Sequence, residues 1–410
     1  MQNTAGTGPA TPIDTTPLLD DPYAAYAALR EAGPVHRITG TDGNPAWLVT
    51  RYDDVRRALA DPRLSLDKRH ATPGGYRGLA LPPALDANLL NMDPPDHTRI
   101  RRLVVKAFTP GRVEALRTPV RRVADGLLDA MERRGAPADL IADYAGPLPI
   151  TVICDLLGIP QHDRPDFLAW SNALITPDPA RPELAKRAVG AMLEFYTGLI
   201  AAKRAEPGDD LLSDLIAVRD DTDGKGDGHG DRLSEDELTS LAFLILLAGY
   251  ENTTHLIGNA VHALLDHPEL LDQLRRNPAE LPTAVEEFLR YDGPAPLAIR
   301  RFPTEDIEIG GVRIPAGDNV LLSIASANRD PARFPDPDTP APGRDLSGHL
   351  ALGHGIHYCL GAALARMETV TALEALLDRF PDLRLDVPRD ALRYRRTLRS
   401  RGLISLPVAW

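Results

Sequence analysis

The alternation of apolar and polar residues predicts a mixed beginning to the chain. Residues 22–32 repeat apolar side chains at helical spacing, and residues 35–49 alternate around a Gly43-Asn44 turn, which is typical of short strands. A second helix is expected over residues 53–60. Between residues 98 and 199, several helical segments follow one another with short breaks at Pro or Gly.

The middle of the chain predicts one long helix. Ser234 with Glu237 three positions later forms a capping box, and residues 238–247 are apolar on nearly all sides, as in a buried helix. This run is far shorter than the roughly 18 residues that suggest a membrane span. Residues 307–324 alternate Ile and Val between Gly- and Pro-marked turns, which indicates a small sheet. The whole pattern predicts a mainly α fold with a minor β region.

Composition narrows the class of protein. The 410 residues carry a net charge of −12, which argues against nucleic acid as the partner, and the low cysteine number fits a reducing, cytoplasmic compartment. Residues 1–20 are rich in Thr, Pro and Gly and lack the pattern of a signal peptide, so we expect a flexible N-terminal tail. No linker interrupts residues 21–410, which are expected to form a single domain without a membrane anchor.

One Gly-rich segment carries a thiol just before a helical stretch. Residues 353–361 read Gly-His-Gly-Ile-His-Tyr-Cys-Leu-Gly. Helix N-terminal amides stabilise a thiolate, and glycines let the backbone approach a flat ligand. Two alternatives stay open at this point: a zinc site made by His354, His357 and Cys359, which lacks a fourth ligand nearby, and an inert cysteine in a tight turn. The second cysteine, Cys154, lies in an apolar helical run and is expected to be a core thiol.

This segment, continued by Ala-Ala-Leu-Ala-Arg over residues 362–366, resembles the cysteine-ligand loop of the bacterial members of the cytochrome P450 family. The resemblance implies the P450 fold, with haem b (iron protoporphyrin IX) between the long central helix and this loop. It also implies that Cys359 is the axial iron ligand, whose thiolate favours cleavage of the O–O bond of dioxygen. Leu352 departs from the family, which usually has a Phe packed against the loop. An aliphatic side chain keeps the burial but loses aromatic contacts near the sulfur, so the reduction potential is expected to differ.

A second stretch of the same resemblance is Glu287-Phe-Leu-Arg290, which is similar to the family's Glu-x-x-Arg pair. On a helix these two side chains share a face and can form a salt bridge. The resemblance implies that an arginine of a later loop, here Arg344, closes the network.

A third set of residues is implied to bind the two haem propionates. His97 and Arg101 are four residues apart, so they share one helical face. The resemblance adds Arg301 and His357 as further partners, with Arg300 a close alternative to Arg301.

The central helix contains Ala248-Gly249-Tyr-Glu251-Asn252-Thr253, which resembles the oxygen-binding stretch of the family. Small side chains at Ala248 and Gly249, with a helix interruption, are expected to leave room for dioxygen, and Glu251 is expected to help deliver protons. Asn252 replaces the usual threonine. An amide can donate a hydrogen bond but cannot relay a proton as a hydroxyl does, so ordered water or Thr253 is expected to take that part.

The resemblance also implies partners that deliver electrons. We expect a ferredoxin and a ferredoxin reductase, because the sequence shows no reductase segment. A basic region is a candidate docking face on the cysteine side of the haem. It comprises residues 99–106 with Arg112, Arg117, Arg121 and Arg122.

The expected substrate is an apolar small molecule, since the segments that line the family's substrate pocket are mostly apolar here. The expected reaction is hydroxylation or epoxidation with dioxygen and two electrons, as a tailoring step on a polyketide-like secondary metabolite. Two alternatives are oxidative coupling or ring formation without oxygen insertion, and a haem-binding sensor without catalysis. The apolar residues in question are Leu79, Leu81, Leu85, Leu89, Leu90, Phe243, Leu244, Leu247, Leu297 and Ile299.

Overall fold

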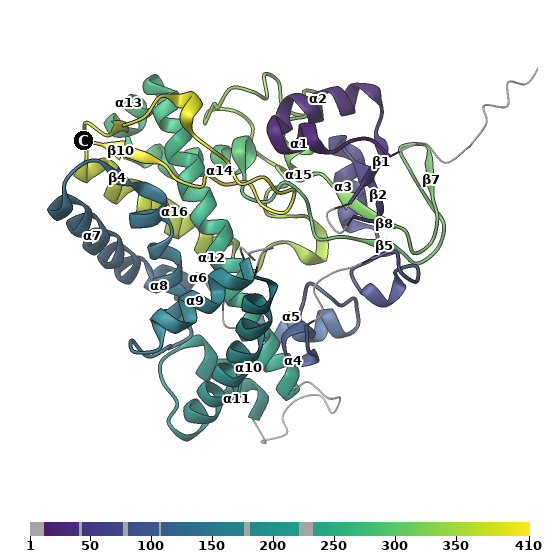
Figure 1. Ribbon diagram of the computed structural model, residues 1–410, viewed down its shortest axis with the longest axis horizontal. Helices are drawn as coiled ribbons and strands as arrows, with labels where there is room; N and C mark the ends of the chain where they lie inside the picture. The colour runs from purple at the N-terminus through teal and green to yellow at the C-terminus, as the bar shows by residue number, and fades with distance from the viewer. Residues whose placement is uncertain (1–11, 41–42, 77–80, 106–107, 176–180, 221–232) are drawn as a thin grey trace, which may run out of the picture.

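The computed structural model describes residues 12–40, 43–76, 81–105, 108–175, 181–220 and 233–410. Helices make up most of it. The short strands β1 (Val35–Thr39), β2 (Pro45–Val49), β5 (Phe302–Pro303) and β8 (Asn319–Leu322) lie with helices α2 (Pro22–Ala32) and α3 (Tyr52–Ala60) on one side (Figure 1). The mainly α fold with a minor β region is therefore confirmed.

The N-terminal part follows the predicted pattern closely. The first predicted helix is α2 (Pro22–Ala32), the two strands are β1 (Val35–Thr39) and β2 (Pro45–Val49), and the next helix is α3 (Tyr52–Ala60). The structure differs at the end of the expected tail, where α1 (Thr16–Asp20) forms because Leu18 is buried in a small apolar cluster with Tyr26 of α2. Residues 1–11 lie outside the described residues.

The sheet predicted over residues 307–324 is split between two sheets. Strands β6 (Ile307–Ile309) and β7 (Val312–Ile314) form an antiparallel hairpin as expected. Strand β8 (Asn319–Leu322) instead pairs in parallel with β2, and Ala46 lies opposite Asn319. A parallel partner so distant in the chain leaves no trace in the local alternation, which is why the pattern did not indicate it.

The long central helix is α12 (Glu235–Asp266), and its capping box is present as predicted: the Ser234 hydroxyl accepts from the Glu237 amide, and the Glu237 carboxylate accepts from the Ser234 amide. Its N-terminal part belongs to one large apolar cluster and its C-terminal part to another. Residues 247–252 between the two are only partly buried or exposed. The polar stretch that resembles an oxygen-binding site therefore lies between two cores.

A buried ion pair fixes helix α14 (Leu281–Asp292), as the Glu-x-x-Arg pattern predicted. The Arg290 guanidinium donates to both oxygens of Glu287 at 2.7 and 2.8 Å, and neither side chain is exposed to solvent. Arg344 Nε lies 3.5 Å from Glu287 Oε1. The Arg290 guanidinium also donates to the carbonyls of Asn328 and Pro337, so the pair ties α14 to the loop that precedes the Cys359 segment.

No helix among the described residues is long and apolar enough to cross a membrane.

The remaining helices and strands complete the fold. The other helices are α4 (Pro83–Asp86), α5 (Asp96–Val105), α6 (Pro110–Ala115), α7 (Arg117–Arg134), α8 (Pro147–Leu156), α9 (Arg164–Ile175), α10 (Pro182–Ala205), α11 (Leu211–Asp220), α13 (Pro268–Arg276), α15 (Ile324–Asn328) and α16 (Ala362–Arg379), with short helical turns η1 (Lys68–His70), η2 (Ile141–Ala145), η3 (Pro278–Glu280), η4 (Gly355–His357) and η5 (Arg389–Ala391). The other strands are β3 (Leu64–Ser65), β4 (Ala138–Asp139), β5 (Phe302–Pro303), β9 (Arg384–Leu385) and β10 (Pro407–Ala409).

Candidate active site

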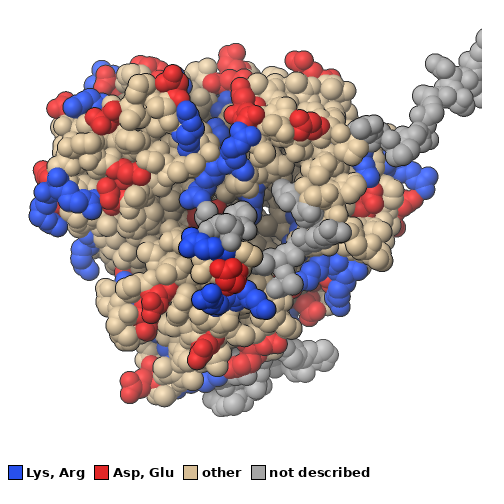
Figure 2. All heavy atoms as spheres, viewed as in Figure 1, with Lys and Arg blue, Asp and Glu red and all other residues tan. Residues whose placement is uncertain are grey.

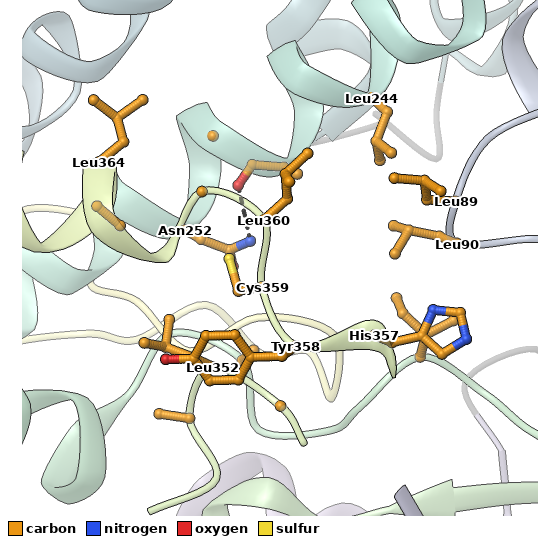
Figure 3. A pocket seen from close by; sticks show the side chains of 18 of the residues that line it. Leu89, Leu90, Leu244, Asn252, Leu352, His357, Tyr358, Cys359, Leu360 and Leu364 are labelled. Carbon is orange, nitrogen blue, oxygen red and sulfur yellow. Dashed lines mark hydrogen bonds between the residues drawn. The ribbon is translucent and has the colours of Figure 1, made fainter. Parts of the chain in front are cut away.

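A cavity lies between α12 and the loop that carries Cys359. Figure 3 shows Asn252 of α12 and the Cys359 side chain projecting into this space, with Leu89, Leu90 and Leu244 on one side of it. Six of the residues that the sequence analysis proposed for haem binding and oxygen chemistry on these two elements line the cavity wall: Ala248, Gly249, Asn252, Thr253, His357 and Cys359.

The loop before α16 holds the Cys359 backbone in a fixed turn. Gly353 and Gly355 have φ angles of +79° and +75°, a region that side-chain-bearing residues rarely adopt. The Cys359 amide donates to the Leu352 carbonyl at 2.8 Å. Leu352 itself is buried, as predicted for the aliphatic replacement. The thiol is thus presented at the N-terminus of α16.

The electrostatics of Cys359 combine opposing effects. The thiol faces the cavity, but the surrounding protein removes it from bulk water, and this burial raises its pKa. The Gly361 amide and the charges of Arg101 and Arg366 lower the pKa, as expected for a helix N-terminus, yet burial has the larger effect. A metal ion bound to the sulfur would favour the thiolate.

Four basic side chains gather at one end of the same cavity. Arg101, Arg301 and His357 line it, and the rings of His97 and His357 lie 4.2 Å apart between their centroids. His97 is 1% exposed, yet neither of its ring nitrogens has a hydrogen-bond partner within the described chain. Arg301 is also buried, and its Nε is unpartnered in the same sense. Buried polar groups normally have partners, so this cluster is built to receive an anion.

The pKa shifts in this cluster agree with that conclusion. Burial, together with the charges of Arg101 and Arg301, lowers the pKa of His97 to about 4. Burial, followed by the charges of His97, Arg301 and Arg101, lowers the pKa of His357 to about 3. Each cation thus disfavours the charged form of its neighbours as long as no anion is bound. Haem carries two carboxylates and one iron that accepts a thiolate, so the donor set fits this cofactor.

Arg300 and Arg301 differ in where their side chains lie. The Arg300 guanidinium donates to the Asn91 side chain at 2.7 Å and to the Leu90 carbonyl, and Arg300 does not line the cavity. Arg301 lines it. The cation that faces the cavity is therefore Arg301.

Replacing Arg301 by Gln is expected to have opposite effects on the haem-free and haem-loaded protein. The haem-free protein should unfold at a higher temperature, because one buried unpaired cation is removed. The haem-loaded protein should release haem between about tenfold and a hundredfold faster, because one charge-assisted hydrogen bond is lost. Thermal unfolding and haem transfer to apomyoglobin measure the two effects. Arg300→Gln is the matched control, and equal haem release from both variants would contradict the assignment of Arg301.

The stretch that resembles an oxygen-binding site lies on the cavity wall, but the predicted helix interruption was wrong. Helix α12 runs unbroken from Glu235 to Asp266. Asn252 lines the cavity and its amide donates to the Ala248 carbonyl at 3.1 Å, a bond visible in Figure 3. A Cβ on Gly249 would come within 2.8 Å of Ile153 Cδ1 of α8, so this glycine permits close helix packing as well as space in the cavity. The Asn252 side chain thus adds a hydrogen bond to a backbone carbonyl of the preceding turn, and the helix continues without a kink.

Glu251 lies on the same helix but is not among the residues that line the cavity. Its Oε2 accepts from Arg399 at 2.9 Å, and its side chain is 12% exposed. Burial raises the pKa of Glu251, but His255, Arg399 and Ser400 outweigh this and hold the pKa at about 2. The predicted acid is therefore ionised and directed toward the C-terminal loop.

Sequence reasoning missed a second acid that does line the cavity. Glu368 of α16 is 2% exposed, and its Oε1 has no hydrogen-bond partner in the described chain. Burial raises the pKa of Glu368 well above its ordinary value, so the group is held as a neutral carboxylic acid. In the sequence, Glu368 is one of several charged residues on a helix, and no local signal distinguishes it.

The remaining predictions about the cavity and its surroundings are partly confirmed. Of the apolar residues proposed to contact substrate, Leu89, Leu90, Leu244, Leu297 and Ile299 line the cavity, whereas Leu81, Leu85, Phe243 and Leu247 do not, and Leu79 lies outside the described residues. Cys154 is a buried core thiol, and burial raises its pKa to about 11.

The zinc alternative finds no support in the geometry. Within the part of the chain that the structure describes, no three His, Cys, Asp or Glu side chains are grouped so as to hold a metal ion. The pair His354 and His357, which lines the cavity with Cys359, therefore does not form a zinc site with it.

The basic region is largely engaged within the molecule. Arg99 pairs with Glu237, Arg112 with Asp214, Arg117 with Glu114 and Arg121 with Asp125, while residues 106–107 lie outside the described residues. Arg101 Nη2 donates to the Tyr358 carbonyl at 2.5 Å, which places α5 against the Cys359 loop. On the face shown in Figure 2, Lys and Arg side chains gather around a central hollow although the whole chain is acidic.

Comparisons with known proteins agree with this site. The sequence profile of the family described as Cytochrome P450 matches residues 21–390. The chain is 47% identical over 393 residues to cytochrome P450 monooxygenase PikC of Streptomyces venezuelae, covering 95% of this chain and 91% of PikC. It is 45% identical over 396 residues to the 6-deoxyerythronolide B hydroxylase of Saccharopolyspora erythraea, covering 95% of this chain and 96% of the hydroxylase.

A solved structure of a P450 monooxygenase has the same fold as this chain. The tirandamycin C-bound P450 monooxygenase TamI is 44% identical and superposes with a TM-score of 0.87, covering 97% of this chain and 99% of TamI. Membership implies a haem-iron cofactor, dioxygen, redox partners and a small-molecule substrate. The chain therefore belongs to the cytochrome P450 family and is an oxidoreductase of the monooxygenase class.

Proposed function

We propose that this enzyme binds haem b and hydroxylates or epoxidises an apolar, polyketide-like small molecule in a tailoring step of secondary metabolism. We further propose that residues 21–410 act as one domain in the cytoplasm, and that a ferredoxin and a ferredoxin reductase supply the two electrons. The observation that carries the substrate class is the wall of the cavity around Asn252. That wall is formed mainly by leucine, isoleucine and alanine side chains from several segments of the chain.

The apolar wall limits what the cavity can bind. Leu89 and Leu90 precede α5, Leu244 lies on α12, and Leu297 lies before β5. Burying apolar surface supplies about 25 cal/mol per Å², so a large neutral ligand is held mainly by its carbon skeleton. Of the polar groups on the α12 wall, Asn252 and Thr253 can orient a carbonyl or hydroxyl group of the ligand.

The residues divide the chemical task between the two sides of the cavity. When bound, haem supplies the activation of dioxygen. On this chain, Cys359 would hold the iron, and His97, Arg101, Arg301 and His357 would hold the propionates. The leucines exclude water from the reaction space, which prevents loss of reactive oxygen species. Asn252 donates a hydrogen bond, Thr253 can relay a proton, and Glu251 supplies protons from outside the cavity wall.

The likeness to PikC and to the hydroxylase of 6-deoxyerythronolide B supports the tailoring role, and the contact of α5 with the Cys359 loop supports electron entry there. Since Arg99, Arg112, Arg117 and Arg121 are already paired, a ferredoxin carboxylate would have to compete with their partners. Docking should therefore be weak and sensitive to salt.

Turnover under labelled dioxygen tests the proposal. The haem-loaded enzyme, a ferredoxin and its reductase are incubated with 6-deoxyerythronolide B as a neutral macrolactone probe. The mass of the product is then measured by mass spectrometry. We expect one labelled oxygen atom in the product. A product that has lost hydrogen without gaining label would favour oxidative coupling or ring formation. Absence of any product with this probe would contradict the polyketide-like substrate class.

A further inference from the structure

One apolar wall of the cavity is fixed to a sheet. Residues 297–301 form this wall, and all but one of them line the cavity. The Ala298 amide donates to the Leu322 carbonyl of β8 at 2.9 Å, and Arg301 exchanges two backbone hydrogen bonds of 2.9 Å with Val320 of the same strand. The position of this wall is therefore set by the sheet.

A neighbouring wall is a turn that belongs to no helix or strand. Leu89 and Leu90 lie between α4 and α5, both line the cavity, and Figure 3 shows them on one side of it. The Asn91 amide closes the turn by donating to the Asn88 carbonyl at 3.0 Å, and the Leu90 amide donates to the Asn88 side chain at 3.1 Å. These bonds shape the turn, but they do not determine where it lies relative to the other walls.

One end of this turn is anchored to the central helix. The side-chain amide of Asn88 donates to the Ser240 hydroxyl of α12 at 3.1 Å, and the two residues are 5% and 0% exposed. The same amide group donates to the Leu85 carbonyl at 3.3 Å. A buried polar group whose partners are in place holds one orientation. The first end of the turn is therefore fixed relative to α12.

Arg300 anchors the other end of the turn. It is the one residue of the sheet-supported wall that does not line the cavity, because extended chain directs successive side chains to opposite sides. Its guanidinium donates from Nη2 to Asn91 Oδ1 at 2.7 Å and from Nη1 to the Leu90 carbonyl at 3.3 Å. Arg300 thus joins the wall supported by the sheet to the turn that contains the two leucines.

The partners of this guanidinium are neutral. The Tyr76 ring lies 5.2 Å from the guanidinium carbon of Arg300, and Tyr76 packs edge-on against the buried Phe302 with ring centroids 5.5 Å apart. The partners of Arg300 are therefore an amide oxygen, a carbonyl and an aromatic ring. A planar guanidinium with two donors in a fixed geometry sets both distance and orientation, which a lysine ammonium does not. These contacts are suited to positioning the turn.

We propose that Arg300 is a positioning residue that holds the turn of Leu89 and Leu90 against the sheet-supported wall, and that the separation it sets determines the bulk of the ligand the cavity accepts. This inference rests on the proposed function, in which the cavity binds an apolar small molecule. A gap of about 0.5–1 Å already forfeits roughly a quarter to a half of the dispersion attraction between two surfaces. A turn free to move outward therefore weakens the binding of a small ligand, which needs both walls, more than that of a large ligand.

Hydrogen exchange of the haem-loaded enzyme tests the positioning without any ligand or turnover. The amides of Leu90 and Asn91 are hydrogen-bonded within the turn, so their exchange reports its opening. In Arg300→Gln these amides should exchange about tenfold faster, because a charge-assisted hydrogen bond to the turn is lost. Arg313→Gln is the matched control, since the Arg313 side chain is 78% exposed and pairs with Asp306. Equal exchange in wild type and Arg300→Gln would overturn the positioning role.

A double-mutant cycle separates the contact from a general loss of stability. If Arg300 and Asn91 act through their mutual hydrogen bond, the protein with both Arg300→Gln and Asn91→Ala should exchange no faster than the faster single variant. Arg300→Lys should recover only part of the wild-type protection, because an ammonium lacks the planar pair of donors. Effects of the two substitutions that simply multiply would contradict the contact.

Calorimetric titration of the haem-loaded enzyme with two neutral rings tests the role in specificity. The larger probe is 6-deoxyerythronolide B and the smaller is cyclododecanone. In Arg300→Gln, the Kd of cyclododecanone should rise about tenfold, equivalent to losing roughly 55 Å² of apolar contact, whereas the Kd of 6-deoxyerythronolide B should change less than about threefold. Haem content should equal that of the wild type, because Arg300 does not line the cavity. An unchanged ratio of the two constants would overturn the role in specificity.

The proposed function and this inference fail in different ways. If the wild type binds neither ring, the substrate class and the specificity role are both wrong, and hydrogen exchange alone decides whether Arg300 positions the turn. If the wild type binds both rings and Arg300→Gln keeps their ratio, the substrate class stands and only the specificity role is wrong. If Arg300→Gln does not retain haem, Arg300→Lys and Asn91→Ala are compared with the wild type in the same two measurements.

Discussion

Replacing Cys359 by Ser is expected to reduce turnover to the level of the haem-free protein. A serine hydroxyl stays protonated near neutral pH and gives the iron no anionic sulfur, so the push of electron density that drives O–O cleavage is lost. Haem should still bind at reduced occupancy, because Arg101, Arg301 and His357 line the cavity and His97 packs against His357 without help from the sulfur. Product formation and bound haem are measured on the same sample.

The chain provides a matched control in its other cysteine. Cys154 lies in α8, is 2% exposed and is not part of the cavity wall. Cys154→Ala should retain full haem occupancy and turnover while losing about 1 kcal/mol of stability through the small void it leaves. Turnover by Cys359→Ser at a rate close to that of Cys154→Ala would show that the thiolate is not required.

The second large effect is expected at the buried pair of Glu287 and Arg290. Glu287→Gln leaves the Arg290 guanidinium fully buried without a carboxylate, and removing one partner of such a pair costs about 3–5 kcal/mol. Because Glu287 also accepts from the Ala341 amide at 2.7 Å, the loop before the Cys359 segment should loosen as well. Urea unfolding of the haem-loaded protein and the rate of haem loss measure the two consequences.

Glu114→Gln is the control for this prediction. Glu114 and Arg117 have the same spacing of three residues, but their side chains are 64% and 43% exposed. An exposed pair of this kind contributes at most about 1 kcal/mol. Similar losses of stability in the two variants would mean that burial does not determine the strength of the Glu287 pair.

Local patterns were sufficient for much of the fold and for one half of the site. The spacing of Ser234 and Glu237, the turn at Gly43 and the glycines around Cys359 are decided by neighbouring residues, so the sequence displays them directly. The resemblance then brought together Cys359, His97, Arg101, Arg301 and His357. The structure places four of these on the wall of one cavity and the fifth, His97, against His357.

Long-range contacts decided what the sequence could not show. The parallel pairing of β8 with β2 joins segments more than two hundred residues apart, and the partner of Glu251 is Arg399 in the C-terminal loop. The continuous course of α12 was also missed, because small residues in a helix predict a weak point but do not require a break. Burial of Glu368 and His255 depends on the packing of α16 and of the loop at Gly402, which no local pattern records.

A bond between iron and the sulfur of Cys359 is the central requirement of the proposed monooxygenase activity. The absorption spectrum of the purified, reduced protein exposed to carbon monoxide reports the iron and its axial ligand together. We predict a strongly red-shifted Soret band, as a thiolate ligand produces. A haem spectrum without that shift would mean a neutral ligand and contradict the monooxygenase account, and a colourless protein would contradict the haem site itself.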